Sequence, residues 1–200
     1  MTYYRRRLPH WQPEGASIFL TWRLHGSVAR TLHTVEWESL TDGQRFLLWD
    51  HELDTASTGP TYLKNPLVAA TVVETFFLAS QDWELCELFA WVVMSNHVHL
   101  LVKPKRPLRE ITRAVKSTSA REANRILGRV GLPFWKDESY DHWIRDAKEF
   151  ERIRRYIELN PVKAGLVTEP ELWAWSSASH AGTLAGQDLP HIDQPPPNAL

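Results

Sequence analysis

The chain has 200 residues, of which 43% are hydrophobic and 24% charged, a composition typical of one soluble globular domain. Its single cysteine, Cys86, excludes an internal disulfide and a cysteine-based zinc cluster, and no run approaches the ~18 apolar residues of a membrane span. The formal net charge of −1 excludes a uniformly basic protein, and we expect a cytoplasmic location without membrane association.

The chain begins with a basic arm, residues 1–16. It combines aromatic residues with three consecutive arginines, Arg5, Arg6 and Arg7. Cationic and aromatic side chains of this kind can enter a groove of DNA or stack on unpaired bases. We therefore treat the three arginines as candidate contacts to nucleic acid.

A strand and an insertion follow the arm. The segment "SIFLTWRL", residues 17–24, is rich in aromatic and β-branched residues and predicts a strand. The next region, about 28–60, is polar and acidic, with a helix expected near residues 34–51. This insertion is longer than the fold needs, and the sequence assigns no role to any residue in it.

A helix and a hairpin come next. Asn65 is a typical helix cap and Pro66 suits the first helical position, so we expect a buried helix to about Ser80. Two apolar runs, residues 85–94 and 97–103, are separated by a two-residue turn and predict antiparallel strands.

The charge is concentrated in residues 103–129, which carry nine basic and two acidic side chains. That segment has a net charge of +7, which leaves −8 for the rest of the chain. We expect a helix over residues 108–127 whose basic side chains contact phosphates, although a solvated helix face is the alternative. The candidate contacts are Lys103, Lys105, Arg106, Arg109, Arg113, Lys116, Arg121 and Arg125.

The remaining elements complete a recognisable order. Residues 138–145 alternate and predict a strand, and a helix is expected over residues 147–159, before Pro161. The order β-α-β-β-α-β-α, with a central hairpin, is that of the split βαβ, ferredoxin-like folds. We predict an α+β domain over residues 17–182, with an antiparallel sheet and helices on one face, and a flexible Pro-rich tail over residues 183–200.

Two histidines interrupt the second strand of the hairpin. His97 and His99 share one side of the strand, whereas Val98 points to the other. Two imidazoles placed in this way can converge on one metal ion. A half-exposed strand end, with solvated histidines, is an equally good interpretation of this stretch alone.

The last predicted helix carries a second polar pair. Phe150, Ile153 and Ile157 form its apolar stripe, and Tyr156 and Asn160 lie one turn apart beside that stripe. If this edge faces the histidines, a phenol and an amide join them in one site. Taken singly, Tyr156 suits an amphipathic core position and Asn160 suits a cap for the next helical turn.

Four blocks of sequence together resemble a known family. They are "MSNHVHLLV", "FWKDESYDHWIRD", "RRYIELNPVKAGLV" and "WAWSSA", and their order and content are similar to those of the single-tyrosine HUH transposases, in particular the REP-associated branch. The resemblance extends over residues 17–181. It implies the HUH endonuclease type of ferredoxin-like fold.

The resemblance also implies a chemistry. His97 and His99 match the metal-binding pair, Tyr156 matches the nucleophile, and Asn160 matches the polar residue that completes the metal site. The implied cofactor is Mg²⁺ or Mn²⁺, which positions a phosphodiester and offsets its charge. Tyrosine attack would leave a 5′-phosphotyrosine and a free 3′ hydroxyl, which can later rejoin the strand.

The implied partner is single-stranded or hairpin DNA, with repetitive palindromic elements as the expected source. The protein would then associate with the nucleoid when bound, and a homodimer is an alternative to a monomer. Tyr140 and His142, in "ESYDHWIR", form another polar cluster, and we keep His142 as a residue that supports the site or contacts DNA.

Two other functions remain open from the sequence. A zinc hydrolase could use the same histidine pair, although it needs further ligands and a general base. A ferredoxin-like module that binds nucleic acid without cleaving it is the non-enzymatic alternative. Replacement of Tyr156 separates the three, because only the transposase depends on a phenol.

Overall fold

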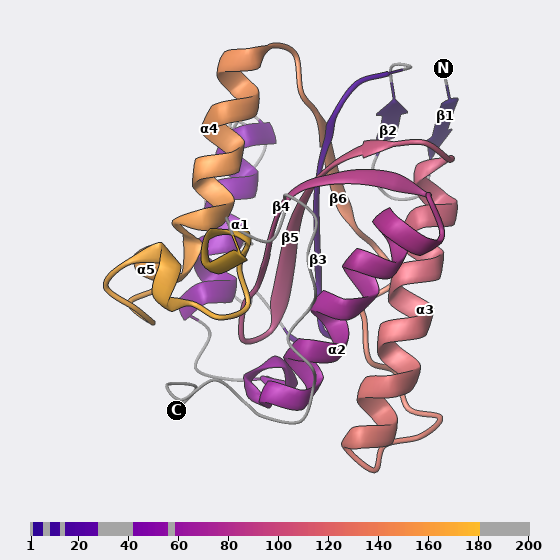
Figure 1. Ribbon diagram of the computed structural model, residues 1–200, viewed down its shortest axis with the longest axis vertical. Coiled ribbons are helices and arrows are strands. Elements are labelled where there is room, and N and C mark those ends of the chain that lie inside the picture. The colour runs from indigo at the N-terminus through magenta and orange to yellow at the C-terminus, as the bar shows by residue number, and fades with distance from the viewer. Residues whose placement is uncertain (1, 6–8, 13–14, 28–41, 56–58, 181–200) are drawn as a thin grey trace.

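The computed structural model describes residues 2–5, 9–12, 15–27, 42–55 and 59–180. Its centre is a four-stranded sheet in the order β4-β5-β3-β6, with every neighbouring pair antiparallel (Figure 1). The strands are β3 (Ile18–Arg23), β4 (Cys86–Val93), β5 (His97–Pro104) and β6 (Tyr140–Trp143). This is the split βαβ arrangement, so the predicted α+β class and antiparallel sheet are confirmed.

The helices cover both faces of the sheet. Helices α2 (Pro66–Phe77) and α3 (Leu108–Ile126) lie on one side, and α1 (Asp42–Thr55) and α4 (Ala147–Glu158) on the other, where the short α5 (Asn160–Lys163) follows α4 (Figure 1). The expectation that all helices pack on one face is therefore wrong. The reason is that the strands are apolar on both sides, so each face has to be buried.

The alternation along β3 shows how the two layers form. Ile18, Leu20 and Trp22 belong to the core beneath α2 and α3, whereas Phe19 packs with Ile157 of α4. Thr21 lies between Phe19 and Arg23 and so points to the α4 side. Polar residues buried in this sheet therefore gather on one face only.

Local sequence signals account for most helix boundaries. The side chain of Asn65 accepts a hydrogen bond from Leu67 N at 3.0 Å at the start of α2, as predicted. Asp146 caps α4 in the same way, because its side chain accepts from Glu149 N at 2.7 Å. Helix α4 is thus fixed at its beginning, which sets the positions of the residues one and three turns later.

The described residues of the N-terminal arm form two short strands. Strands β1 (Thr2–Arg5) and β2 (Pro9–Gln12) pair as a small antiparallel hairpin. Arg6 and Arg7, residues 34–41 of the helix expected near residues 34–51, and the tail of residues 183–200 lie outside the described residues, whereas the rest of that expected helix falls in α1. In the described part of the chain, no helix has both the length and the apolar character needed to cross a membrane.

Candidate active site

The two histidines of β5 point to the α1 and α4 side of the sheet and are fully buried. Their Nε2 atoms lie 3.1 Å apart, so the predicted convergence is present. Each ring is oriented through its other nitrogen: His99 Nδ1 lies 2.7 Å from Thr21 Oγ1, and His97 Nδ1 lies 2.7 Å from Asn96 Oδ1. Such partners fix the ring so that both Nε2 atoms face the same point.

Burial also sets the charge of His97. It lowers the pKa of His97 to about 3, and the neighbouring His99 acts in the same direction. His97 is therefore neutral near pH 7, and its Nε2 can donate an electron pair to a metal ion. The interpretation as a half-exposed strand end is wrong, because neither imidazole reaches solvent.

Helix α4 brings Tyr156 to the histidines. Its stripe of Phe150, Ile153 and Ile157 packs on the sheet, as predicted, and this places the Tyr156 ring 5.8 Å from the ring of His99. Phe19 packs edge-on against the same tyrosine at 6.1 Å and so limits its movement.

Asn160 lies one turn further along and is 1% exposed. Its Nδ2 is 3.4 Å from His99 Nε2, whereas its Oδ1, the atom that a cap would use, accepts no hydrogen bond from the described residues. The side chain therefore belongs to the polar cluster. Rotation of the amide by half a turn would present Oδ1 in place of Nδ2 to His99.

Two further acidic residues reach the site from α1, inside the insertion to which the sequence assigned no role. Asp50 is 2% exposed, and its Oδ1 lies 3.2 Å from His99 Nε2 and 3.6 Å from His97 Nε2. Asp54, one turn later, places Oδ1 3.7 Å from His97 Nε2. The i, i+4 spacing of two aspartates in "WDHELD" was the signal that could have indicated them.

The same carboxylate links the histidines to the tyrosine. Asp50 Oδ2 accepts a hydrogen bond from the Tyr156 hydroxyl and one from Asn160 Nδ2 at 3.3 Å. Burial alone would raise the pKa of Asp50, but the neighbouring His99 and the hydrogen bonds outweigh it and hold this pKa well below its usual range. Burial and the charge of Asp50 together raise the pKa of Tyr156, so the phenol is protonated.

The cluster has the properties of a cation site. Ligand atoms of Asp50, His97 and His99 lie within 4.8 Å of one another. Among the described residues, no hydrogen-bond donor faces three buried oxygens of the cluster: Oδ1 of Asp50, of Asp54 and of Asn160. Buried oxygens normally have a partner, and a divalent ion would supply one, so the residues present fit such an ion.

Two residues of "ESYDHWIR" lie near the cluster without joining it. Tyr140 packs edge-on against Phe19 at 6.3 Å. His142 Nε2 lies 3.2 Å from Glu149 Oε1, at the beginning of α4. His142 thus contributes to the position of α4, and its contact with DNA stays a prediction.

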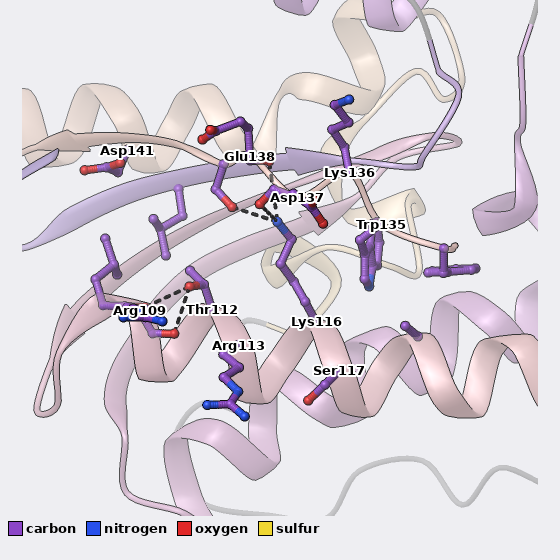
Figure 2. Close-up of a pocket in the computed structure, with 15 residues that line it drawn as sticks. Arg109, Thr112, Arg113, Lys116, Ser117, Trp135, Lys136, Asp137, Glu138 and Asp141 are labelled. Atoms are coloured by element: carbon purple, nitrogen blue, oxygen red, sulfur yellow. Dashed lines mark hydrogen bonds between the residues drawn. The ribbon is translucent and has the colours of Figure 1, made fainter. Parts of the chain in front are cut away.

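The basic residues of α3 lie on the opposite side of the sheet. Arg109, Arg113 and Lys116 share a face of the helix and line a cavity of about 450 Å³ between α3 and residues 134–141 (Figure 2). Lys116 Nζ donates to Asp137 O at 3.0 Å and to Ser139 Oγ at 2.9 Å across this cavity. These basic side chains are separate from the histidine cluster, acidic residues (Asp137, Glu138 and Asp141) line the same cavity, and contact with phosphates stays a prediction.

Residues 61–160 match the model of a family described as IS200-like transposases. Among solved structures, the chain is similar to a REP-associated tyrosine transposase bound to a REP hairpin, with a TM-score of 0.54 and 19% identity over 97% of this chain and 91% of that one. A structure described as a candidate transposase from Deinococcus radiodurans R1 aligns at 18% identity with a TM-score of 0.38, over 72% of this chain and 89% of that one. No curated protein gave a significant match.

Proposed function

Because the chain belongs to the IS200-like transposase family, we propose that it cuts and rejoins single-stranded DNA through a covalent bond between Tyr156 and a 5′ phosphate. One observation carries this proposal: the Tyr156 hydroxyl and the Nε2 atoms of His97 and His99 surround the same carboxylate, that of Asp50. A candidate nucleophile and candidate metal ligands therefore lie around one buried carboxylate.

The proposed reaction needs no external energy source, because one phosphoester bond forms as another breaks. The Tyr156 oxygen attacks the phosphorus, the new bond joins that oxygen to the 5′ phosphate, and the bond to the 3′ oxygen breaks. The phenol loses its proton, and the leaving 3′ oxygen gains one. Attack on the phosphotyrosine by a 3′ hydroxyl reverses these changes and restores a DNA strand.

His97, His99 and, after rotation of its amide, Asn160 would hold a divalent ion. Mg²⁺ or Mn²⁺ fits a set of imidazole and oxygen ligands, with Mn²⁺ the better match for imidazole. Such an ion supplies positive charge beside the phosphate and lowers the barrier to attack. Around it, Phe19 restricts the tyrosine ring and Thr21 orients His99.

We propose that the substrate carries a hairpin, held in part by α3. The similar solved structure is described as bound to a REP hairpin, and this chain places Arg109, Arg113 and Lys116 around one cavity (Figure 2). Phosphate contacts of this kind position a duplex stem without reading its sequence.

The test is covalent capture of DNA. The full chain is incubated with Mn²⁺ and labelled hairpin-bearing single strands from the DNA that flanks its gene, and denaturing gels score the adduct. We expect adduct from the wild type and from Tyr140→Phe, and none from Tyr156→Phe with DNA binding retained. An adduct that survives Tyr156→Phe would contradict the nucleophile, and zinc-dependent hydrolysis unaffected by this change would favour a zinc hydrolase instead.

A further inference from the structure

The role of α1 extends beyond the residues that the family model matches. That match covers residues 61–160, whereas α1 ends at Thr55. Yet Asp50 of α1 is 2% exposed and lies at the centre of the polar cluster. An insertion that only decorated the surface would have no reason to bury a carboxylate among two histidines, because removing a charge from water costs several kcal/mol.

The two oxygens of Asp50 face different partners. Oδ2 accepts hydrogen bonds from the Tyr156 hydroxyl and from Asn160 Nδ2. Oδ1 lies 3.2 Å from His99 Nε2 and 3.6 Å from His97 Nε2, with no hydrogen-bond donor of its own. Oδ2 is therefore occupied by hydrogen bonds from Tyr156 and Asn160, whereas Oδ1 faces the two histidines.

A cation would give the second oxygen the partner that it lacks among the described residues. Asp50 is 2% exposed and both histidines are 0% exposed, so bulk solvent does not reach this oxygen. Divalent ions such as Mg²⁺ and Mn²⁺ prefer carboxylate oxygens to amide oxygens. Asp50 Oδ1 is thus a stronger ligand for such an ion than Asn160 Oδ1, which is also buried without a partner.

We infer that Asp50 is a further ligand of the divalent ion and that its second oxygen positions the Tyr156 hydroxyl beside that ion. This inference rests on the proposed function, because it assumes that the cluster binds a cation. It makes α1 part of the active site, and in the observed orientation of its amide Asn160 then holds the carboxylate in place by donating from Nδ2 instead of binding the ion through Oδ1.

The first arm of the test measures metal binding without any reaction. Free Mn²⁺ is followed by electron paramagnetic resonance during titration of the full chain, and Co²⁺ binding is followed by its visible spectrum. We expect Asp50→Asn to weaken Mn²⁺ binding by about 10–100-fold and to change the Co²⁺ spectrum, with a larger loss for His97→Ala. Glu52→Gln, which removes one charge from the same helix outside the cluster, should bind Mn²⁺ as the wild type does.

The second arm separates the ligand from the positioning role. At Mn²⁺ concentrations that saturate each variant, Asp50→Asn keeps an oxygen that accepts from the Tyr156 hydroxyl, whereas Asp50→Ala does not. We therefore expect faster adduct formation by Asp50→Asn than by Asp50→Ala. If Asp50→Ala does not fold, as judged by circular dichroism, Asp50→Glu replaces it: its longer side chain shifts the accepting oxygen, so adduct should form more slowly than in the wild type at saturating Mn²⁺.

The two arms test the ligand role and the positioning role of Asp50 separately. Unchanged Mn²⁺ affinity and Co²⁺ spectrum in Asp50→Asn, with loss in His97→Ala, would overturn the ligand role. Equal rates of adduct formation for Asp50→Asn and Asp50→Ala at saturating Mn²⁺, or a wild-type rate for Asp50→Glu where Asp50→Ala does not fold, would overturn the positioning role. The metal-binding arm does not depend on Tyr156 as nucleophile, whereas the rate arm does, and Tyr156→Phe tests that assumption separately.

Discussion

The two sides of β5 differ in chemistry although the strand is buried along most of its length. His97 and His99 face α1 and α4, whereas Val98, Leu100 and Val102 belong to the apolar core beneath α2 and α3. The polar side contains three buried oxygens without hydrogen-bond donors, a state that costs stability. The apolar side shows the dense packing that can offset this cost and keep the strand rigid.

Neighbouring residues of β3 show the same division. Trp22 packs edge-on against Phe76 and Trp135, each at 6.2 Å, whereas Thr21 contacts His99 Nδ1 at 2.7 Å. One position therefore serves the core and the next serves the site. Substitutions at these two positions should have separable effects on stability and on function.

The largest effect on stability is expected from Trp22→Ala. Trp22 is 1% exposed, and removal of a buried aromatic side chain leaves a cavity, so the free energy of unfolding should fall by about 3–5 kcal/mol. Urea denaturation followed by circular dichroism measures this change.

The control for Trp22→Ala is Thr21→Val, on the other face of the same strand. Valine is similar in size to threonine but cannot make the hydrogen bond to His99, so the free energy of unfolding should decrease by about 1 kcal/mol. Its Mn²⁺ affinity should fall about 10-fold, because His99 loses the partner that orients it. If both variants lost stability and metal affinity alike, the two faces would not be separable.

A smaller effect concerns the pH dependence of stability. Burial and the charge of Asp50 raise the pKa of Asp54 to about 7, so this carboxyl stabilises the fold below its unfolded pKa and loses that contribution as pH rises through about 7. His97, with its pKa lowered to about 3, acts in the opposite direction, because its contribution is lost as pH falls below its unfolded value of about 6.5. The two effects should nearly cancel between about pH 4 and 6.5.

Asp54→Asn should remove that cancellation. In the presence of a chelator, the Tm of the variant should rise from about pH 4 to 6.5, because only the His97 contribution remains, whereas the Tm of the wild type should change little. Thermal melts at several pH values measure both curves. Parallel curves for the two proteins would show that Asp54 titrates as an ordinary exposed carboxyl.

The sequence predicted the elements whose signals are local. The Asn65 cap, the apolar stripe of α4 and the alternation of β5 each depend on residues close in the chain, and each is present. Tyr156 and Asn160 could be joined to the histidines only through the resemblance to a family, since 57 or more residues separate them from the pair. The fold brings them together because α4 packs its stripe on the sheet.

Asp50 and the second helical layer could not be predicted in this way. The insertion has an acidic composition that suits a solvated surface, and the i, i+4 spacing of Asp50 and Asp54 shows that they share a helix face but not that this face packs against β5. The expectation that all helices cover one face of the sheet is wrong for a related reason. The hydrophobic pattern of a strand shows that a side is buried, but it does not show which distant helix covers it.

The smallest effect is expected on the cationic surface, and it compares two parts of α3. Arg109 and Arg113 are exposed, line the cavity and have no ion-pair partner among the described residues, whereas Arg121 and Arg125 each lie within 3.3 Å of Glu122. Phosphate contact by the second pair must compete with that carboxylate, although exposed ion pairs are individually weak. The first pair should therefore contribute more to DNA binding.

The double variant Arg109→Ala/Arg113→Ala should bind hairpin DNA more weakly, and the slope of log affinity against log salt should decrease by about 2, one for each phosphate that an arginine no longer neutralises. Fluorescence anisotropy at several salt concentrations measures this slope, with Arg121→Ala/Arg125→Ala as the matched control of equal charge. A larger decrease in this slope for the control variant would indicate that DNA contacts α3 near Arg121 and Arg125 instead. Because both pairs lie on the side of the sheet opposite to the histidines, Mn²⁺ affinity should stay unchanged in either variant, so a shared loss would show that the two faces are coupled.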